Sequence, residues 1–270
     1  MSGAPLGPLY LTVGHVTIDL VERAGRAEPE RRPGGGAFHS ALQAARLGMR
    51  ARIFTQGVGS QIDELLGPYA DELSWRTLEA DATTTLATAG SGPTTRQRVL
   101  AWAGPIDPED GLLEEIGAGA AIVHAAPVAL ETPVAVLARM QAIGAFTAIT
   151  PQGLLRRWEG RGGEIALTDI DDEALGGDWS GAAFNERELD HCAALLERVR
   201  DGTVVAVTRG AEPTWVHHHG GVAQVPVPDV VRAGDVDDLG AGDVFAAAFF
   251  IALWEGTPPA QAARFANGAA

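Results

Sequence analysis

The sequence contains no lysine. All 20 of its basic residues are arginines, and 35 Asp and Glu residues leave a net charge of −15 and a sequence pI near 4.8. Without lysine the chain can form no Schiff base and has no phosphate-binding P-loop, whose motif requires that residue. General nucleic-acid binding and docking on anionic lipid both need a cationic surface. The acidic balance therefore argues against nucleic acid and against a membrane surface as partners.

Cysteine is nearly absent as well. Cys192 is the only one, so the chain cannot hold a disulfide framework, and a reducing compartment fits. The longest apolar run, Val244–Trp254, is shorter than the ~20 residues needed to span a bilayer. Residues 1–10 have neither the basic nor the apolar region of a signal peptide. We therefore expect a cytoplasmic protein with no membrane partner.

The remaining composition is ordinary for a globular protein, with 46% hydrophobic and 20% charged residues over a length of 270. Strand and helix patterns alternate from about residue 108 onward, which is typical of βαβ units and a mostly parallel sheet. β-Rich segments near 15–32 and 84–104 do not fit that sheet and indicate a small β element attached to a single domain over 1–270. The expected strands include 9–13, 51–54, 120–124, 145–150, 182–185 and 203–208, with a hairpin at 214–225, and the expected helices are 38–47, 62–73, 133–143, 188–199 and 244–254.

The densest pattern in the sequence is Asp237-Asp238-Leu239-Gly240-Ala241-Gly242-Asp243, which opens an apolar segment. Glycines let successive backbone N–H groups point one way at a helix N-terminus, where the helix dipole also favours an anion. Asp243 would then be placed as a general base for a hydroxyl that attacks a phosphoryl group. Two alternatives stay open: a plain Asp N-cap without a ligand, and half of a dinucleotide-binding G-x-G-x-x-G motif. The second fits poorly, because Phe245 occupies the third glycine position.

Five elements occur in an order that resembles the ribokinase-like (PfkB) carbohydrate kinases. Residues 237–243 look like that family's D-T-x-G-A-G-D signature, and residues 34–48 are similar to its G-G-x-x-x-N-x-A…L-G segment. Residues 185–188 match N-x-x-E, residues 208–210 match the start of T-x-G-x-x-G, and residues 14–19 match G-x-x-x-x-D. The resemblance implies a three-layer α/β fold with a mostly parallel central sheet and a small β lid, formed by the segments near 15–32 and 84–104.

The resemblance also implies a reaction, the transfer of a phosphoryl group from ATP, with Mg²⁺, to a hydroxyl of a small sugar or other polyhydroxylated acceptor. Asp243 is the implied catalytic base, and the backbone N–H groups of Gly240, Ala241 and Gly242 are the implied anion hole. The other implied residues are Asn185 and Glu188 for Mg²⁺ and phosphate through water, Thr208, Gly210 and Asn267 for the nucleotide, and Asp19, Gly34, Gly35 and His39 for the acceptor.

The sequence departs from the family pattern at three places. His39 stands where the family usually has Asn, so the acceptor is not expected to be contacted as in ribokinase, because an imidazole presents its donor and acceptor in a different geometry. Asp238 replaces the signature Thr and adds negative charge beside the anion site. Pro213 replaces the last Gly of the nucleotide-loop motif, so that loop is expected to differ.

A narrower resemblance concerns the acceptor. Residues 83–85, 96–100 and 150–156 look like segments of inositol-kinase-like members, which implies a polyol or cyclitol acceptor contacted by Arg98 and Gln152. The threonines of 83–85 also fit a plain lid strand, because Thr favours strands. The alternatives are a nucleoside kinase of the same fold and a non-catalytic sugar- or nucleotide-binding protein. Some relatives pair through their lids, so the resemblance also allows a homodimer.

Overall fold

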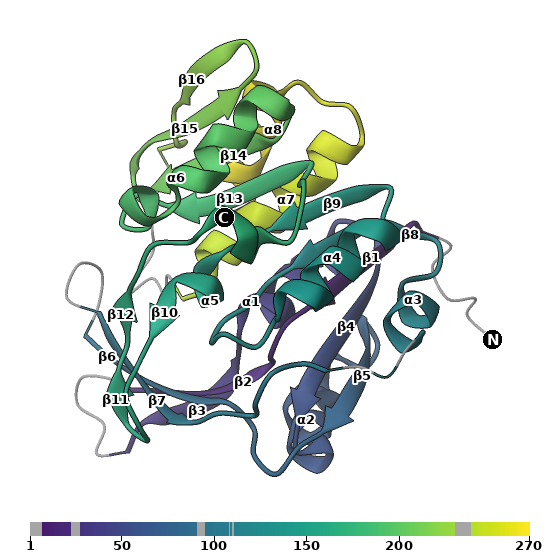
Figure 1. Cartoon of the computed structure of the whole chain (residues 1–270), viewed down its shortest axis with the longest axis vertical. Coiled ribbons are helices and arrows are strands. Elements are labelled where there is room, and N and C mark those ends of the chain that lie inside the picture. Colours follow the sequence, from purple (N-terminus) through teal and green to yellow (C-terminus); the bar gives the residue numbers. More distant parts are fainter. Residues whose placement is uncertain (1–6, 23–27, 91–94, 108, 110, 230–238) are drawn as a thin grey trace.

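The largest element of the structure is a nine-stranded sheet. The computed structural model describes residues 7–22, 28–90, 95–107, 109, 111–229 and 239–270. Within these residues the strand order is β16-β15-β14-β13-β9-β8-β1-β4-β5, parallel from β14 to β5 and antiparallel at the β14–β15 and β15–β16 pairs (Figure 1). The strands are β1 (Leu9–Val13), β4 (Arg50–Gly57), β5 (Leu73–Glu79), β8 (Ala120–Ala125), β9 (Phe146–Ile149), β13 (Gly181–Asn185), β14 (Val204–Arg209), β15 (Glu212–His218) and β16 (Gly221–Val225).

Helices cover both faces of this sheet, and the central strand β1 is therefore buried along its whole length. Side chains alternate along β1: Leu11 packs in the core under α3 and α4, whereas Tyr10 packs in the core under α1 and α7. The result is three layers, helix, sheet and helix. The helices are α1 (Gly36–Arg46), α2 (Gly59–Leu66), α3 (Leu112–Gly117), α4 (Val134–Ile143), α5 (Gln152–Leu155), α6 (Ala193–Glu197), α7 (Ala241–Trp254) and α8 (Pro259–Ala269).

Helix α7 is apolar on all sides and is buried on all sides from Phe245 to Ala252. It packs against α1, α8 and the sheet, and its alanines at 246–248 let these neighbours approach closely. The first turn of a helix held in this way has little freedom to move. Asp243 lies in that turn, so the packing of α7 fixes the position of its backbone.

A second, five-stranded sheet lies at one end of the main one (Figure 1). Its order is β11-β7-β6-β2-β3, and every pair is antiparallel except β2–β6. The segments near 15–32 and 84–104 supply four of the strands, whereas the fifth comes from a part of the chain that the sequence did not mark. The strands are β2 (Thr17–Val21), β3 (Glu30–Gly34), β6 (Thr85–Ala89), β7 (Arg96–Ala101) and β11 (Gly163–Glu164), and a separate short pair joins β10 (Arg156–Arg157) to β12 (Ala166–Leu167).

Two of the expected helices are wrong in extent. The helix expected at 62–73 ends at Leu66, because Pro68 has no N–H for a further helical hydrogen bond, and Leu73 already begins the edge strand β5. The helix expected at 188–199 is broken into the 3₁₀ turn Leu189–His191, the short helix α6 and the 3₁₀ turn Arg198–Asp201. The α/β class with a mostly parallel sheet is confirmed. No helix in the described part of the chain is long and apolar enough to cross a membrane.

Candidate active site

The candidate residues gather where the parallel strands of the main sheet end. Strand β13 ends at Asn185, β14 ends just after Thr208, and β9 leads into α5, which begins at Gln152. Parallel strands present their carboxyl ends at one edge of a sheet, where ligands of α/β proteins commonly bind. The first turn of α7 reaches the same edge, since a Cβ on Gly36 would lie 3.0 Å from the Asp243 Oδ1 and 3.3 Å from the Cβ of Ala126, which follows the end of β8. The Ser40 Oγ on α1 also donates a hydrogen bond to the Asp243 carbonyl oxygen at 3.2 Å.

The turn before α7 has the backbone shape that an anion hole needs. Gly240 has a φ of +88°, a left-handed conformation that favours glycine, and α7 starts directly after it. The ring of His39 lies against this turn, with its Cγ 2.8 Å from the point where a Cβ on residue 240 would stand. Ala241 is partly exposed and Gly242 is exposed, so the helix N-terminus can be reached from solvent. Asp237 and Asp238 lie outside the described residues.

The carboxylate of Asp243 lies in a poorly solvated position, although the residue keeps part of its surface accessible. Burial raises the pKa of Asp243 to about 7; Arg156 opposes this rise, and Glu188 and Asp19 add to it. Space for the carboxylate depends on Gly36, since a Cβ there would lie 3.0 Å from the Asp243 Oδ1. A carboxylate that titrates near neutral pH is suited to accept a proton from a hydroxyl group.

A second carboxylate, Asp19, lies on β2 of the smaller sheet. It is buried, and its Oδ1 accepts a hydrogen bond from the Thr17 Oγ1 at 2.6 Å. Burial raises the pKa of Asp19, while the Thr17 hydroxyl and the nearby arginines 32 and 156 lower it. Gly34 contacts the Asp19 carboxylate so closely that no side chain fits between them, and Gly35, with a φ of +91°, turns the chain from β3 into α1.

Glu188 and its partners form the third part of the site. The Asn185 backbone N–H donates to the Glu188 Oε2 at 3.0 Å, and the Gln152 Nε2 donates to the Glu188 Oε1 at 3.4 Å. Burial raises the pKa of Glu188, and the hydrogen bond from Asn185 and the charge of Arg156 oppose the rise. The structure thus brings Gln152 to the 185–188 segment, which lies 36 residues away in the sequence.

The residues expected at the nucleotide lie further along the same half of the sheet. The Thr208 Oγ1 donates to the Phe184 carbonyl oxygen at 3.4 Å, and Gly210, with a φ of +61°, turns the chain from β14 into β15. The Asn267 side chain accepts from the Thr214 Oγ1 at 2.8 Å and donates to two carbonyl oxygens, those of residues 225 and 226. Asn267 therefore ties α8 to the β15–β16 hairpin.

The model of the pfkB family carbohydrate kinases matches this chain over residues 8–270. The chain belongs to this family. The expected resemblance is thereby confirmed, and with it the class of enzyme, a phosphotransferase of the carbohydrate-kinase type. No curated protein sequence matches this pfkB-family kinase.

Solved structures of related fold agree with the family. A pyrophosphate-dependent kinase of the ribokinase family, in complex with sulfate, has a TM-score of 0.78 and 20% identity, over 96% of this chain and 92% of that one. The ribokinase of Thermotoga maritima has a TM-score of 0.71 and 18% identity, over 96% and 90%. The adenosine kinase of Sinorhizobium meliloti has a TM-score of 0.68 and 20% identity, over 96% and 91%. These structures confirm the ribokinase-like fold of this kinase.

Arg156 is a site residue that the sequence did not mark. It follows α5 and is buried, with its Nη1 donating to the Val128 carbonyl oxygen at 2.9 Å and its Nη2 donating to the Gln97 Oε1 on β7 at 2.8 Å. Burial lowers the pKa of Arg156, and the charges of Glu188, Asp19, Asp243 and Glu131 raise it. The only available signal was its place at the end of the 150–156 segment.

Arg98, in contrast, is not brought to this cluster. Successive side chains of β7 point to opposite faces of the smaller sheet, and Gln97 is the one that reaches Arg156. Arg98 is exposed. The arginine that the structure places among the site carboxylates of this pfkB-family kinase is therefore Arg156.

The carboxylate of Glu188 would suit a hydrated Mg²⁺. The described residues contain no group of three or more His, Cys, Asp or Glu side chains that could hold a metal ion directly. Mg²⁺ prefers oxygen ligands and keeps several waters, and it is usually held by one or two carboxylates together with substrate phosphates. Glu188, with its carboxylate oriented by Asn185 and Gln152, offers such oxygens.

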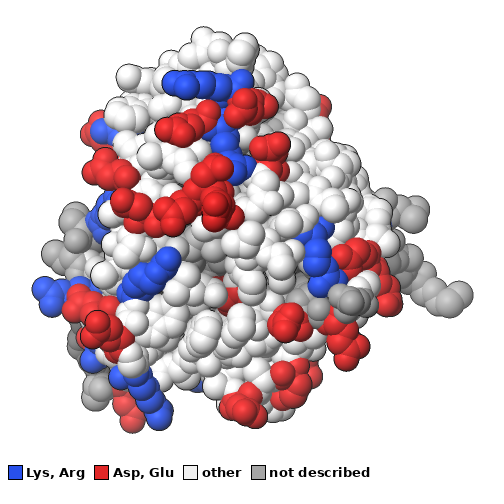
Figure 2. All heavy atoms as spheres, in the orientation of Figure 1, with Lys and Arg blue, Asp and Glu red and all other residues white. Residues whose placement is uncertain are grey.

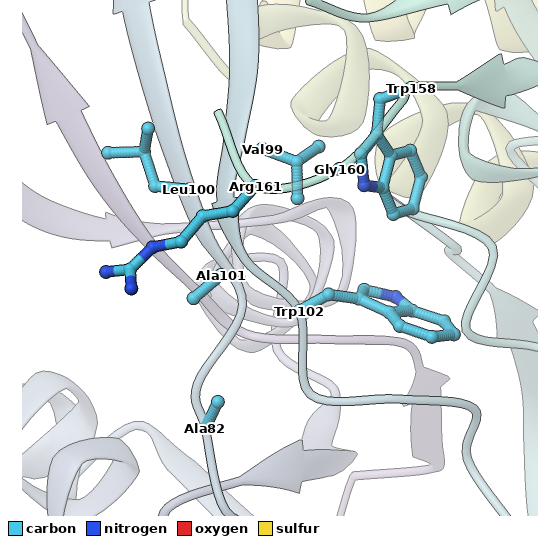
Figure 3. A pocket seen from close by; sticks show the side chains of 8 residues that line it. All are labelled: Ala82, Val99, Leu100, Ala101, Trp102, Trp158, Gly160 and Arg161. Atoms are coloured by element: carbon cyan, nitrogen blue, oxygen red, sulfur yellow. The ribbon is translucent and has the colours of Figure 1, made fainter. Parts of the chain in front are cut away.

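A cavity of about 450 Å³ in the described part of the chain is lined by none of these residues. Figure 3 shows Trp102 and Trp158 on one side of it and the side chains of Leu100 and Arg161 on the other. The two indoles meet edge to face at 6.0 Å, and the Trp102 Nε1 already donates to the Ala129 carbonyl oxygen at 2.6 Å. The mainly apolar lining offers little to a polyhydroxylated molecule, whose hydroxyl groups need hydrogen-bond partners.

Proposed function

We propose that this pfkB-family kinase transfers a phosphoryl group from ATP, with Mg²⁺, to a hydroxyl group of a small sugar, polyol or cyclitol. The observation that carries the proposal is the position of Asp243. It lies in the first turn of α7, beside the turn 240–242 and within the electrostatic reach of Asp19 and Glu188. A base, an anion-binding turn and a second carboxylate for the acceptor are thus combined in one place.

In the proposed reaction, Asp243 accepts the proton of the acceptor hydroxyl while the acceptor oxygen forms its bond to phosphorus. The bond from phosphorus to the bridging oxygen of the donor breaks, and its electron pair leaves with ADP. The backbone N–H groups of Gly240, Ala241 and Gly242 face the phosphoryl oxygens and stabilise their negative charge. Fixed dipoles of this kind need no rearrangement during the transfer. Mg²⁺, when bound, would neutralise charge on the donor phosphates, and Asn185 and Glu188 would hold it through water.

The acceptor is expected between Asp19 and Asp243, next to Gly34, Gly35 and His39. Buried carboxylates accept hydrogen bonds from hydroxyl groups and therefore suit a polyol ring. A similar solved structure, a pyrophosphate-dependent kinase with 19% identity, contains myo-inositol, which supports the cyclitol alternative. A nucleoside kinase is the second candidate, because the adenosine kinase structure is also similar. A non-catalytic binding protein is the third.

The donor has two candidates. ATP is supported by the solved Arabidopsis thaliana ribokinase, which is complexed with ribose and ATP, at a TM-score of 0.70 and 21% identity over 97% of this chain and 91% of that one. Pyrophosphate is the alternative, because the solved structures with the TM-score of 0.78 are described as pyrophosphate-dependent. Arg209 lies next to Thr208 at this end of the site, bonded to Glu186 and placed over the Trp215 ring, and its charge suits either donor.

The location and assembly of the protein belong to the same proposal. A single cysteine, which is buried, is in keeping with a reducing, cytoplasmic location. The homodimer allowed by the family resemblance is tested by the molar mass in solution, measured by light scattering during size-exclusion chromatography. A mass of twice 28.1 kDa supports it, and a mass equal to the chain contradicts it.

The proposed function is tested by phosphorylation assays with a two-way panel. ATP and pyrophosphate, each with Mg²⁺, are combined with inositols, pentoses, hexoses and nucleosides, and phosphorylated products are detected by phosphorus NMR. Turnover of a cyclitol or sugar supports the proposal, whereas turnover of nucleosides alone assigns the second candidate. Binding of donor and acceptor by calorimetry without any product across the panel assigns a binding protein.

A further inference from the structure

The first turn of α1 presents one face to the first turn of α7. Residues 36, 39 and 40 share that face, because helix positions three and four apart lie on the same side. A Cβ on Gly36 would lie 3.0 Å from the Asp243 Oδ1, and the Ser40 Oγ donates a hydrogen bond to the Asp243 carbonyl oxygen. The ring of His39 lies against Gly240. Three residues of α1 therefore contact the turn that carries the proposed base.

The contact between His39 and Gly240 is made by the face of the imidazole ring. The point where a Cβ on residue 240 would stand lies 2.8 Å from the His39 Cγ, 2.8 Å from its Nδ1 and 2.9 Å from its Cδ2. A point nearly equidistant from three atoms of a planar ring lies above the ring and not at its edge. The ring of Phe38, a buried residue, lies 5.0 Å from the imidazole between centroids. The imidazole therefore packs against its own helix as well as against the turn before α7.

The position of Gly240 sets the direction in which α7 starts. Its carbonyl oxygen accepts hydrogen bonds from the N–H groups of Asp243 and Val244 at 3.0 and 2.9 Å, and these bonds begin the helix. The N–H groups of residues 241 and 242 follow directly, in the first turn, where N–H groups have no partner within the helix. A shift of Gly240 would therefore redirect the N–H groups that are proposed to meet the phosphoryl oxygens.

We propose that His39 is a positioning residue, whose ring holds the anion-binding turn 240–242 in place through its contact with Gly240. The inference rests on the proposed function and deepens it. The family resemblance implies a contact with the acceptor at position 39, whereas here the Cγ, Nδ1 and Cδ2 of the ring lie over the backbone of Gly240. His39 therefore acts on the phosphoryl donor, through Gly240 and the N–H groups that follow it.

The first test replaces His39 by Ala and by Asn in the full chain. Alanine removes the ring, whereas the planar amide of asparagine replaces the Cγ, Nδ1 and Cδ2 and keeps a contact with Gly240. We expect His39→Ala to weaken donor binding about tenfold and to lower kcat by a similar factor, because a small misplacement of the reacting groups is costly, with the acceptor KM unchanged. His39→Asn should keep most of the donor affinity. Calorimetry with ATP and with pyrophosphate measures donor binding, and thermal unfolding identifies the variants that are folded.

The second test asks whether His39 and Gly240 act through their contact. A Cβ on residue 240 would collide with the ring, so Gly240→Ala should weaken donor binding while the ring is present. In the double variant with His39→Ala, the loss should be at least about threefold smaller than the product of the two single losses. The matched control is Gly256→Ala, beyond the other end of α7. Gly256 has a φ of +84°, and no atom of the described residues lies within 4 Å of the Cβ that it would gain, so this variant carries the backbone strain without the collision.

Three outcomes overturn the inference: unchanged donor binding in a folded His39→Ala, a rise in the acceptor KM alone, or losses at His39 and Gly240 that multiply without coupling. Wild-type turnover tests the proposed function separately, because the ratios of donor affinity need no reaction. A wild type that binds a donor and transfers no phosphoryl group refutes the proposed function, and the ratios still decide whether His39 positions the turn. A wild type that binds neither donor refutes both.

Discussion

At the scale of single residues, the chemistry of this pfkB-family kinase depends on how carboxylates are buried. Asp19, Glu188 and Asp243 all have pKa values raised by burial, and all lie within electrostatic reach of Arg156. Asp243 differs from the other two because it lies at the N-terminus of a helix, where an anion can also bind. That combination makes Asp243 the residue on which turnover should depend most.

Replacing Asp243 by Asn should remove the general base while keeping the shape of the side chain. We expect kcat to fall by about 10²–10⁴-fold, because one positioned base contributes that much, while donor affinity changes little. Steady-state kinetics and calorimetry with the donor measure the two effects. Near-normal turnover in Asp243→Asn would refute the role of base.

The pH dependence of kcat/KM should report the same carboxylate. Asp243 must be deprotonated to accept a proton, and its pKa is raised to about 7. We therefore expect kcat/KM to fall about tenfold for each pH unit below that value and to level off above it. A profile with its midpoint near the ordinary carboxyl value of 3.8 would show that the base is solvated or is a different residue.

Through Asp243, the stability of the folded protein should fall as the pH rises, whereas kcat/KM should rise. The pKa of Asp243 is higher in the folded chain than its ordinary value of 3.8, so its contribution to stability is fully present below that value and is lost as the pH rises through about 7. Asn does not titrate. Asp243→Asn should therefore gain melting temperature relative to the wild type as the pH is raised through this window, and a difference that stays constant with pH would contradict this.

At the scale of elements, the junction between the two sheets depends on one short segment. The segment after β8 carries Glu131. Its carboxylate accepts hydrogen bonds from the backbone N–H groups of residues 128 and 129 and of His15, which precedes β2. This carboxylate is buried and has no exposed surface. Glu131 thus fastens the start of the smaller sheet to the main one and holds the carbonyl that orients Arg156.

Replacing Glu131 by Gln should loosen this junction. Glutamine is neutral and has one carbonyl oxygen in place of two carboxylate oxygens, so all three N–H groups lose a charged acceptor and at least one of them faces an amide NH₂ instead. We expect unfolding in urea to show a loss of about 2–3 kcal/mol. The matched control is Glu159→Gln at an exposed position, which should stay within about 0.5 kcal/mol of the wild type. Equal stability of both variants would show that Glu131 does not hold the junction.

At the scale of the whole molecule, the proposed reaction requires an acidic protein to bind a polyanionic donor. The net charge is −15, and Figure 2 shows carboxylates spread over the main body on the face in view. The field of such a surface repels an incoming phosphate donor, whereas a neutral polyol does not feel it. In the proposed reaction, the backbone N–H groups at the start of α7 would act at short range, after the donor has entered the site.

This charge predicts a dependence on salt that differs between the two substrates. Raising the ionic strength shortens the screening length to about 8 Å at 0.15 M, so the repulsion of the donor weakens. We expect the donor KM to fall as salt is raised, with the KM of a neutral acceptor unchanged as the internal control. A donor KM that rises with salt would show that local positive charge, rather than the net charge, governs donor entry.

Local patterns in the sequence were sufficient for the features that depend on neighbouring residues. The glycines of 240–242 and Asp243 were assigned to a helix start because turn geometry and the helix dipole act within a few residues, and α7 begins there. The alternation of strands and helices predicted the parallel sheet, because consecutive βαβ units place their strands in parallel. The order of short motifs along the chain was sufficient to predict the family, which the family match confirmed.

Only the tertiary structure showed what depends on burial and on long-range pairing. The two-residue strand β11 is defined by its pairing with β7 and has no pattern of its own. Arg156 and Glu131 look like ordinary surface charges in the sequence, and only the packed chain shows that both are buried. Asp243 could be named as a base from the motif alone. Its raised pKa comes from desolvation, which the charges of Glu188 and Asp19 add to and the charge of Arg156 opposes, and only folding brings those charges together.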